Sequence, residues 1–298
     1  MEYSVKIYSR IGELMQGVLP DASAFLVSGL PSRRWFSEAV LRRGAAAGEP
    51  GRDLPPKARE ALAMLERQVG LRLPKDVRIG LRSNIPWGKG LSSSSTDVLS
   101  VLSVADAFWE TGLSAEALYR LAARVEPTDP CLSGDILVFY QHTGNRGVTI
   151  ELPPVTLLYF DAAPEARVDT LQLSRRWQEG AGTFFSRWLH RLIIGAAEKD
   201  YAQVFDAVTC SAEYNQQLLP LPGFAELHKL AEEKGAGVMV AHSGTIAGLL
   251  TKPEEAADLL PRVEALVQRI AGGAASPVYV EHYHSPYHRS LCPAFPAH

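Results

Sequence analysis

The 298-residue sequence has few cysteines, no long apolar run and no large excess of charge of either sign. Its three cysteines, Cys131, Cys210 and Cys292, are far apart, which excludes zinc-binding spacing and a disulfide framework and favours a reducing cytoplasm. No apolar run reaches the roughly 18 residues of a membrane-spanning helix, and residues 1–8 alternate like a strand rather than a signal peptide. A formal net charge of −3 gives no electrostatic reason to expect nucleic acid or a membrane as partner. We therefore expect a cytoplasmic protein of undetermined oligomeric state.

The length is sufficient for two domains with their own cores, and 46% of the residues are hydrophobic. The adjacent prolines 153–154 predict a boundary that separates residues 1–153 from residues 154–298. The mix of strands and helices, with antiparallel signals, favours an α+β fold over a doubly wound sheet. We expect strands at 1–7, 24–29, 77–81, 136–140, 155–160, 237–241, 246–250 and 278–282. Helices are expected at 56–69, 98–109, 114–125, 184–198, 201–211, 223–234 and 254–270, with loops at 9–13 and 44–56 and a loosely ordered end at 285–298.

The most informative segment is the glycine loop at residues 85–97, which contains a lysine and continues into four consecutive serines and a threonine. It follows a predicted strand and precedes a helical pattern, so its backbone N–H groups would meet an anion at the positive end of a helix dipole. A triphosphate fits such a place, and the hydroxyls could reach a metal ion. The segment fails the Walker A pattern, because Gly90 follows Lys89 and Ser83 stands where the first glycine would be. A flexible connector is the alternative, but the strand–loop–helix context favours a phosphate site.

Two carboxylates and a second small-residue loop could supply the remaining chemistry of phosphoryl transfer from ATP. Glu126 and Asp129 lie around a proline, so that one could bind Mg²⁺ with a hydroxyl of Ser93 or Ser94 and the other could act as a base. A helix end followed by an Asp-capped turn is the alternative interpretation. The segment 235–245 would let the backbone approach a ligand, or would form a tight hairpin.

Four segments taken together resemble the motifs of the GHMP small-molecule kinases, and most closely those of the L-threonine kinases of cobalamin biosynthesis. They are Gly-Glu-Leu-Met-Gln-Gly at 12–17, Pro-x-x-x-Gly-Leu-Ser-Ser-Ser-Ser-Thr at 86–96, Glu-Pro-Thr-Asp at 126–129 and Ala-His-Ser-Gly-Thr at 241–245. Two positions depart from the family pattern. Ser92 replaces a glycine, and its extra β-carbon would tighten the loop beside the phosphates, while Ile11 stands where a cysteine is often found.

The resemblance implies a two-domain fold, with residues 1–153 similar to domain 2 of ribosomal protein S5 and residues 154–298 ferredoxin-like. ATP would lie in the cleft between them. It also implies an ATP- and Mg²⁺-dependent kinase that phosphorylates the side-chain hydroxyl of L-threonine, giving O-phospho-L-threonine for the aminopropanol arm of cobalamin. L-serine, homoserine or another small alcohol are alternative acceptors. A catalytically silent metabolite-binding sensor of the same fold is the alternative from a different class.

The resemblance further implies a role for individual residues. The ATP phosphates would be wrapped by Pro86, Gly88, Lys89, Gly90, Leu91, Ser92, Ser93, Ser94 and Ser95. Ser94 and Glu126 would hold Mg²⁺, Lys89 would add positive charge, and Asp129 would orient and deprotonate the acceptor hydroxyl. Besides Asp129, the residues expected to face the acceptor are Glu13, Ser243, Gly244 and Thr245. No residue is assigned to the substrate carboxylate, although an arginine would suit it.

Overall fold

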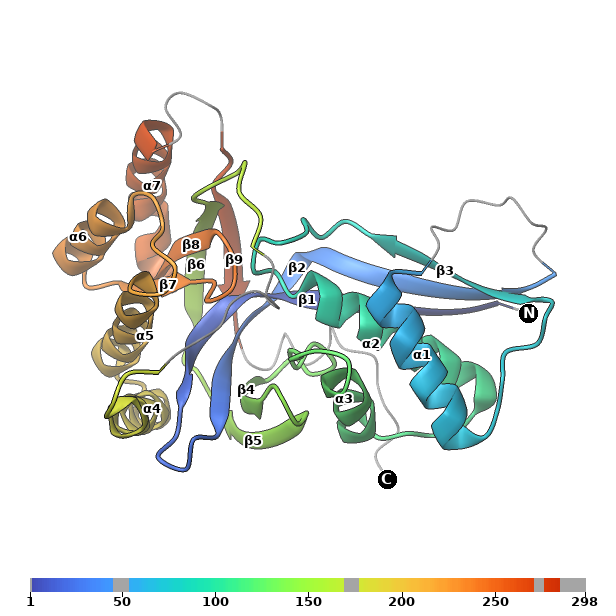
Figure 1. Cartoon of the computed structure of the whole chain (residues 1–298). Helices are drawn as coiled ribbons and strands as arrows, with labels where there is room; N and C mark the ends of the chain where they lie inside the picture. The colour runs from blue at the N-terminus through green and yellow to red at the C-terminus, as the bar shows by residue number, and fades with distance from the viewer. Residues whose placement is uncertain (1, 45–53, 169–176, 271–275, 285–298) are drawn as a thin grey trace.

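The computed structural model describes residues 2–44, 54–168, 177–270 and 276–284. Their nine strands join into one sheet with the order β5-β4-β2-β1-β7-β8-β6-β9, and β3 pairs with β2 outside this path. The two longest strands, β1 (Glu2–Val18) and β2 (Ala24–Arg43), form an antiparallel hairpin that extends across the molecule (Figure 1). Two lobes are therefore connected through this hairpin.

The first lobe consists of the outer part of this hairpin, three further strands and three helices. The strands are β3 (Val77–Ser83), β4 (Ile136–Tyr140) and β5 (Asn145–Ile150). The helices are α1 (Pro56–Val69), α2 (Ser93–Trp109) and α3 (Ala115–Ala123). Helix α2 packs against β1, β2, α1 and α3, and almost every residue from Ser95 to Asp106 is buried. A central, enclosed helix of this kind holds its N-terminus in a fixed position, as a ligand site requires.

The described part of the second lobe contains four strands and four α-helices. The strands are β6 (Val155–Asp161), β7 (Gly237–Val240), β8 (Ile246–Thr251) and β9 (Tyr279–Tyr283). The helices are α4 (Ala181–Glu198), α5 (Tyr201–Gln216), α6 (Phe224–Lys234) and α7 (Ala256–Ile270), with a short 3₁₀ turn at Pro253–Glu255 before α7. All four helices lie on the outer side of the strands in Figure 1. The apolar faces of α6 and α7, together with Ala212 of α5, cover β6, β7 and β8 in one core cluster.

The two lobes share a hydrophobic core. One cluster contains Leu14 of β1, Ile136 of β4, Leu157 of β6, Phe185 of α4 and Met239 of β7. The sheet is also continuous at this place, because Glu13 of β1 pairs with Val240 of β7. These contacts bring the segments at 12–17 and 241–245 together although they are far apart in the sequence. None of the described helices is long and apolar enough to cross a membrane.

The α+β class and most of the predicted elements are confirmed, including the bounds of α1 and β4. The loop expected at 9–13 is wrong, because these residues continue β1 and pair with β2, with register shifts between Tyr8 and Arg10 and between Glu13 and Met15. Buried polar residues and a bulge interrupt the alternation there, so the local pattern resembles a loop. Strand β5 was not predicted, because almost all its residues are exposed. Residues 45–53 of the expected loop and the expected loose end at 285–298 lie outside the described residues.

Candidate active site

A cleft with a volume of about 300 Å³ lies at the N-terminus of α2. This volume is at the lower end of the range found for small-molecule sites. Its described wall comes from β1, the start of α1, the loop and first turn of α2, the segment after α3, the β4–β5 turn and the 241–245 segment. Among the predicted site residues, the wall contains Glu13, Gly88, Gly90, Leu91, Ser92, Ser93, Ser94, Ser95, Glu126, Asp129 and Ser243.

The loop before α2 is held by left-handed backbone conformations and close packing. Gly88, Gly90 and Ser92 have φ values of +74°, +82° and +52°. A β-carbon on Gly90 would lie 2.1 Å from the Ala241 side chain, so only glycine fits there. Ser92 adopts the conformation that glycine favours, at a cost of roughly 1 kcal/mol. The first turn of α2, Ser93 to Ser95, then faces the cleft with backbone N–H groups that have no partner within the helix.

The 241–245 segment supports this loop from behind. The backbone N–H of Thr245 donates to the Lys89 carbonyl oxygen at 3.0 Å. A β-carbon on Gly244 would lie 2.2 Å from the backbone of Lys89 and Gly90. Of the three residues of this segment that were expected to face the acceptor, Ser243 lies in the described cleft wall, whereas Gly244 and Thr245 pack against the loop.

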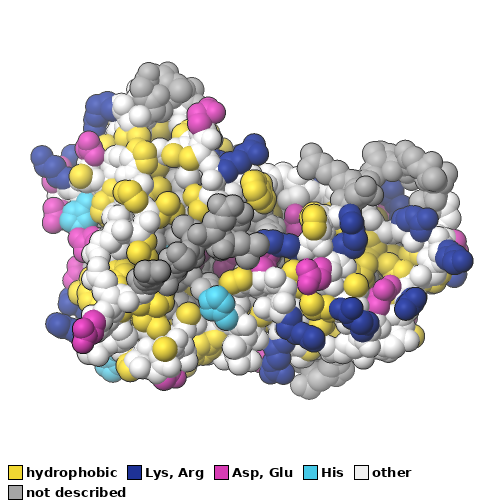
Figure 2. All heavy atoms as spheres, viewed as in Figure 1, with side chains coloured by type: hydrophobic (Ala, Val, Ile, Leu, Met, Phe, Trp, Pro, Cys, Tyr) yellow, Lys and Arg dark blue, Asp and Glu magenta, His cyan; other side chains and the backbone are white. Residues whose placement is uncertain are grey.

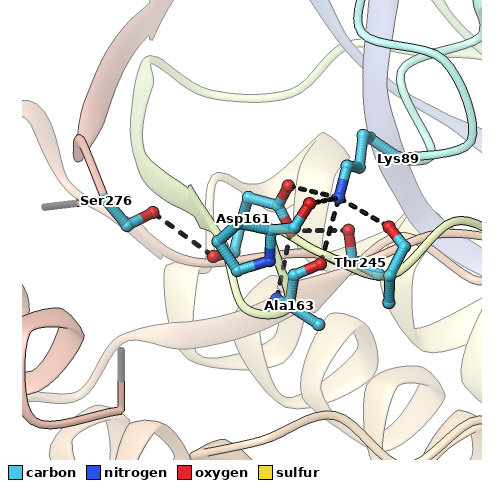
Figure 3. A network of polar contacts seen from close by, with 7 residues as sticks. Lys89, Asp161, Ala163, Thr245 and Ser276 are labelled. Carbon is cyan, nitrogen blue, oxygen red and sulfur yellow. Dashed lines mark hydrogen bonds and ion pairs between the residues drawn. The ribbon is translucent and has the colours of Figure 1, made fainter. Parts of the chain in front are cut away.

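Lys89 is not part of the described cleft wall, and its ammonium points toward Asp161 and the Ala163 backbone (Figure 3). Its ammonium forms an ion pair with Asp161 at 2.8 Å, and the Thr245 hydroxyl donates to the other oxygen of that carboxylate at 2.6 Å. The ammonium also donates to three carbonyl oxygens, those of Ala163, Pro164 and Ala166. Lys89 is only 7% exposed. The expectation of a catalytic, phosphate-binding Lys89 therefore disagrees with its geometry, since its charge is neutralised by Asp161 and its donors are used.

Glu126, by contrast, meets Ser94 as expected. The Ser94 hydroxyl donates to one Glu126 oxygen, and the ammonium of Lys57 contacts the other. A hydroxyl beside a carboxylate is a suitable donor set for Mg²⁺, which takes one or two carboxylates together with phosphates and water. The described residues contain no cluster of three or more His, Cys, Asp or Glu side chains that could hold a metal alone. A Mg²⁺ ion bound at Ser94 and Glu126 would thus need the phosphates as further ligands.

Asp129 lies beside the first turn of α2. Its backbone N–H donates to the Ser95 hydroxyl at 3.0 Å, and this hydroxyl lies 3.3 Å from the Asp129 carboxylate. Removal from water raises the pKa of Asp129 to about 7, and the negative charges of Glu13 and, less strongly, Glu126 act in the same direction. Hydrogen bonds from the Ser92 and Ser95 side chains oppose this rise in pKa. A carboxylate with a pKa near 7 is suited to accept a proton at neutral pH.

Glu13 of β1 lies in the cleft wall and is hydrogen-bonded to the 241–245 segment. Its carboxylate accepts a hydrogen bond from the backbone N–H of His242 at 2.9 Å and lies 3.4 Å from the imidazole Nδ1. The other imidazole nitrogen lies 2.9 Å from the Ser211 hydroxyl of α5, which accepts from the backbone N–H of Gln16. This buried chain fixes Glu13 beside Asp129.

Four residues with a place in this site were not predicted. Lys57 had no signal beyond its place at the start of a helix. Arg10 is fully buried and donates to the carbonyls of Pro130 and Asp135, which fastens the segment after Asp129 to β1. Gln16 and Gln141 form an amide pair in the cleft wall, with Gln16 Nε2 donating to Gln141 Oε1 at 3.0 Å. Gln16 belongs to the 12–17 motif, but its role required the structure.

The amide pair has hydrogen-bonding groups without a partner within the described residues. Gln16 Oε1 is buried and has no hydrogen-bond partner within the described residues. Because each amide carries one acceptor and one donor group, the pair keeps an unused acceptor on one side chain and an unused donor on the other in either orientation. The backbone carbonyl of Gln141 accepts a hydrogen bond from the backbone N–H of Thr128 at 3.0 Å, which ties this residue to the Asp129 segment.

Comparison with known proteins finds kinases that are similar to this chain. Residues 57–141 match the sequence model of the GHMP kinases N terminal domain. Over 249 residues the chain is 28% identical to the L-threonine kinase of Citrobacter freundii, and the matched region covers 80% of this chain and 83% of that protein. The L-threonine kinase of Salmonella typhimurium is 28% identical over 250 residues, covering 80% and 79% of the two chains.

Solved structures show the same fold at low sequence identity. A homoserine kinase from Cytophaga hutchinsonii superposes with a TM-score of 0.64 at 16% identity, covering 95% of each chain. The phosphomevalonate kinase of Streptococcus pneumoniae has a TM-score of 0.69 at 14% identity, covering 95% of this chain and all of the other. The family model and the two relatives support an ATP-dependent small-molecule kinase. Within that class, the chain is similar to the GHMP kinases, over residues 57–141 to the sequence model of their N terminal domain and over most of its length to their fold.

Proposed function

We propose that this kinase transfers the γ-phosphoryl group of ATP to the side-chain hydroxyl of L-threonine, producing O-phospho-L-threonine and ADP. The observation that carries the proposal is the position of Asp129. Its carboxyl group, with a pKa of about 7, lies in the same cleft as the α2 N-terminus and the Ser94–Glu126 pair. Similarity to two L-threonine kinases over 80% of the chain supports threonine as the acceptor. The product would serve the aminopropanol arm of cobalamin biosynthesis.

In the proposed reaction the backbone of residues 88–95 binds the phosphates, with ATP in the cleft between residues 1–153 and 154–298. Ser94 and Glu126 would hold Mg²⁺, which when bound neutralises charge on the phosphate oxygens. The threonine hydroxyl oxygen bonds to the γ-phosphorus, the bond to the β,γ-bridging oxygen breaks, and ADP leaves. The hydroxyl proton passes to the Asp129 carboxylate, which Ser95 holds in place. Positioning and electrostatic stabilisation would supply most of the rate enhancement.

The amide pair supports an amino acid as the acceptor rather than a simple alcohol. One unused acceptor and one unused donor, on Gln16 and Gln141, complement an ammonium group and a carboxylate. Ser243 and Glu13 complete the polar part of the wall. L-serine and homoserine carry the same head group, and a single methyl group contributes only about 1–3 kcal/mol to discrimination. We therefore expect the enzyme to discriminate less strongly between L-threonine and these two amino acids than between L-threonine and mevalonate.

The test is an ATP-consumption assay with L-threonine, L-serine, L-homoserine and mevalonate, with each product identified by phosphorus NMR. The highest kcat/KM is expected with L-threonine. A higher kcat/KM with another acceptor would replace threonine by that compound. Nucleotide binding without turnover of any of the four would instead favour a metabolite-binding sensor.

A further inference from the structure

The cleft has an unusual charge balance for a triphosphate site. Three carboxylates, Glu13, Glu126 and Asp129, lie in its wall. Among the described residues that line it, Lys57 is the only lysine or arginine. The loop sequence suggests Lys89 as a phosphate-binding residue, but its ammonium forms an ion pair with Asp161 and donates to three carbonyl oxygens. A polyanion therefore meets one available cation in this part of the wall.

Lys57 is placed to reach a phosphate group. It lies in the first turn of α1, and its ammonium contacts Glu126 Oε2 while the Ser94 hydroxyl contacts Glu126 Oε1. The ammonium is thus separated by a single carboxylate group from the first turn of α2. Its side chain is 33% exposed, against 6% for Glu126. A lysine ammonium has three donors on a flexible stem, so a contact with one carboxylate oxygen leaves donors for a phosphate.

We infer that Lys57 is a catalytic residue of this kinase, whose ammonium binds an oxygen of the γ-phosphate of ATP. It would stabilise the negative charge on the phosphate oxygens as the phosphoryl group moves from ADP to the acceptor hydroxyl. This role rests on the proposed placement of the phosphates at the α2 N-terminus. The opposing possibility is that Lys57 acts only on Glu126, by neutralising its charge in the folded protein.

Nucleotide binding without metal separates the two roles. The affinities of ATP and ADP are measured by calorimetry in EDTA for the wild type, Lys57→Met, Glu126→Gln and the double variant. If Lys57 contacts the γ-phosphate, Lys57→Met should weaken ATP binding by about tenfold or more and ADP binding much less. The same selective loss should appear when the double variant is compared with Glu126→Gln. The double variant removes both members of the pair, so it avoids leaving an unpaired buried charge if Lys57→Met is unstable.

Two results would overturn the inference. One is equal ATP binding by the wild type and Lys57→Met, including no binding by either. The other is a loss that disappears in the Glu126→Gln background, which would show that Lys57 acts through Glu126 alone. Lys75→Met, at an exposed position outside the cleft, is the matched control and should bind both nucleotides as the wild type does.

The binding measurement contains no acceptor, so its outcome does not depend on which alcohol the enzyme phosphorylates. A wild type that fails to turn over threonine but shows the selective ATP effect would refute the proposed substrate and keep Lys57. Normal threonine turnover without the ATP effect would refute Lys57 and keep the substrate.

Discussion

Replacing Glu13 with glutamine should move the acid limb of the pH–activity profile to lower pH. The proposed base, Asp129, works only in its ionised form, so kcat/KM should fall as the pH drops through its pKa of about 7. The Glu13 charge is the second largest cause of that raised pKa, after burial. Glutamine removes the charge but keeps an oxygen that can accept from His242 N–H. The pKa of Asp129 should therefore fall.

The size of the effect follows from the charge interaction. Near a protein surface, a charge on a neighbouring side chain changes the ionisation free energy of a titratable group by roughly 1–3 kcal/mol. This corresponds to a shift of roughly one unit or more in the pKa of that group. With a pKa of about 7, about a tenth of Asp129 is ionised at pH 6. Lowering that pKa to about 6 would leave about half ionised at pH 6. The ratio of kcat/KM at pH 6 to that at pH 8.5 should rise about fivefold.

The assay is ADP release at saturating ATP and varied L-threonine, between pH 5.5 and 9. The ratio within each variant cancels any loss of activity that does not depend on pH. Asp129→Asn is the control, with an expected loss of about 10²-fold or more and no limb from this residue. Any limb that remains in Asp129→Asn belongs to the nucleotide phosphate or to another group. A limb that persists unchanged there, or that stays at the same pH in Glu13→Gln, would refute the assignment of Asp129 as the base.

Three further substitutions test other parts of the site. Ser94→Ala should raise the Mg²⁺ concentration needed for half-maximal activity, and an unchanged Mg²⁺ dependence in a titration would remove the Ser94 hydroxyl from the metal site. Lys89→Met should lower the free energy of unfolding by about 3 kcal/mol, because Asp161 loses its buried partner, and a thermal melt like that of Lys75→Met would contradict this structural role. Gln16→Leu should raise KM for L-threonine about tenfold or more while KM for ATP changes little, and equal changes in both constants would show that the amide pair does not face the acceptor.

Features that depend on neighbouring residues could be predicted from the sequence. Residues 56–69 form α1 as their helical spacing indicates, and Ser114 caps α3 by accepting from Ala117 N–H. The strand, glycine loop and helix around residues 77–109 are also confirmed as β3, loop and α2. Helix spacing, caps and turns are local properties, because the energies that determine them come from residues only a few positions apart.

Pairing partners and exposure are not local, and the errors in the predicted strands occur there. Residues 9–13 contain polar side chains and a glycine, yet they remain in β1 because β2 supplies hydrogen-bond partners and Arg10 binds the carbonyls of Pro130 and Asp135. Strand β5 has almost no apolar alternation, because one strand of a hairpin at the edge of the sheet can stay exposed on both faces. No pattern within either segment contains this information.

The candidate site divides in the same way. The sequence, through spacing and the family resemblance, indicated which segments could carry phosphate binding and proton transfer, and it placed Ser94 beside Glu126, to which its hydroxyl donates a hydrogen bond. Only the tertiary structure decided where each charged side chain points. Lys89 is adjacent to the glycines that would bind phosphate, yet its ammonium is held by Asp161, whereas Lys57 reaches Glu126 from another helix. A long side chain binds the nearest available opposite charge in space, and folding, not sequence order, places that charge.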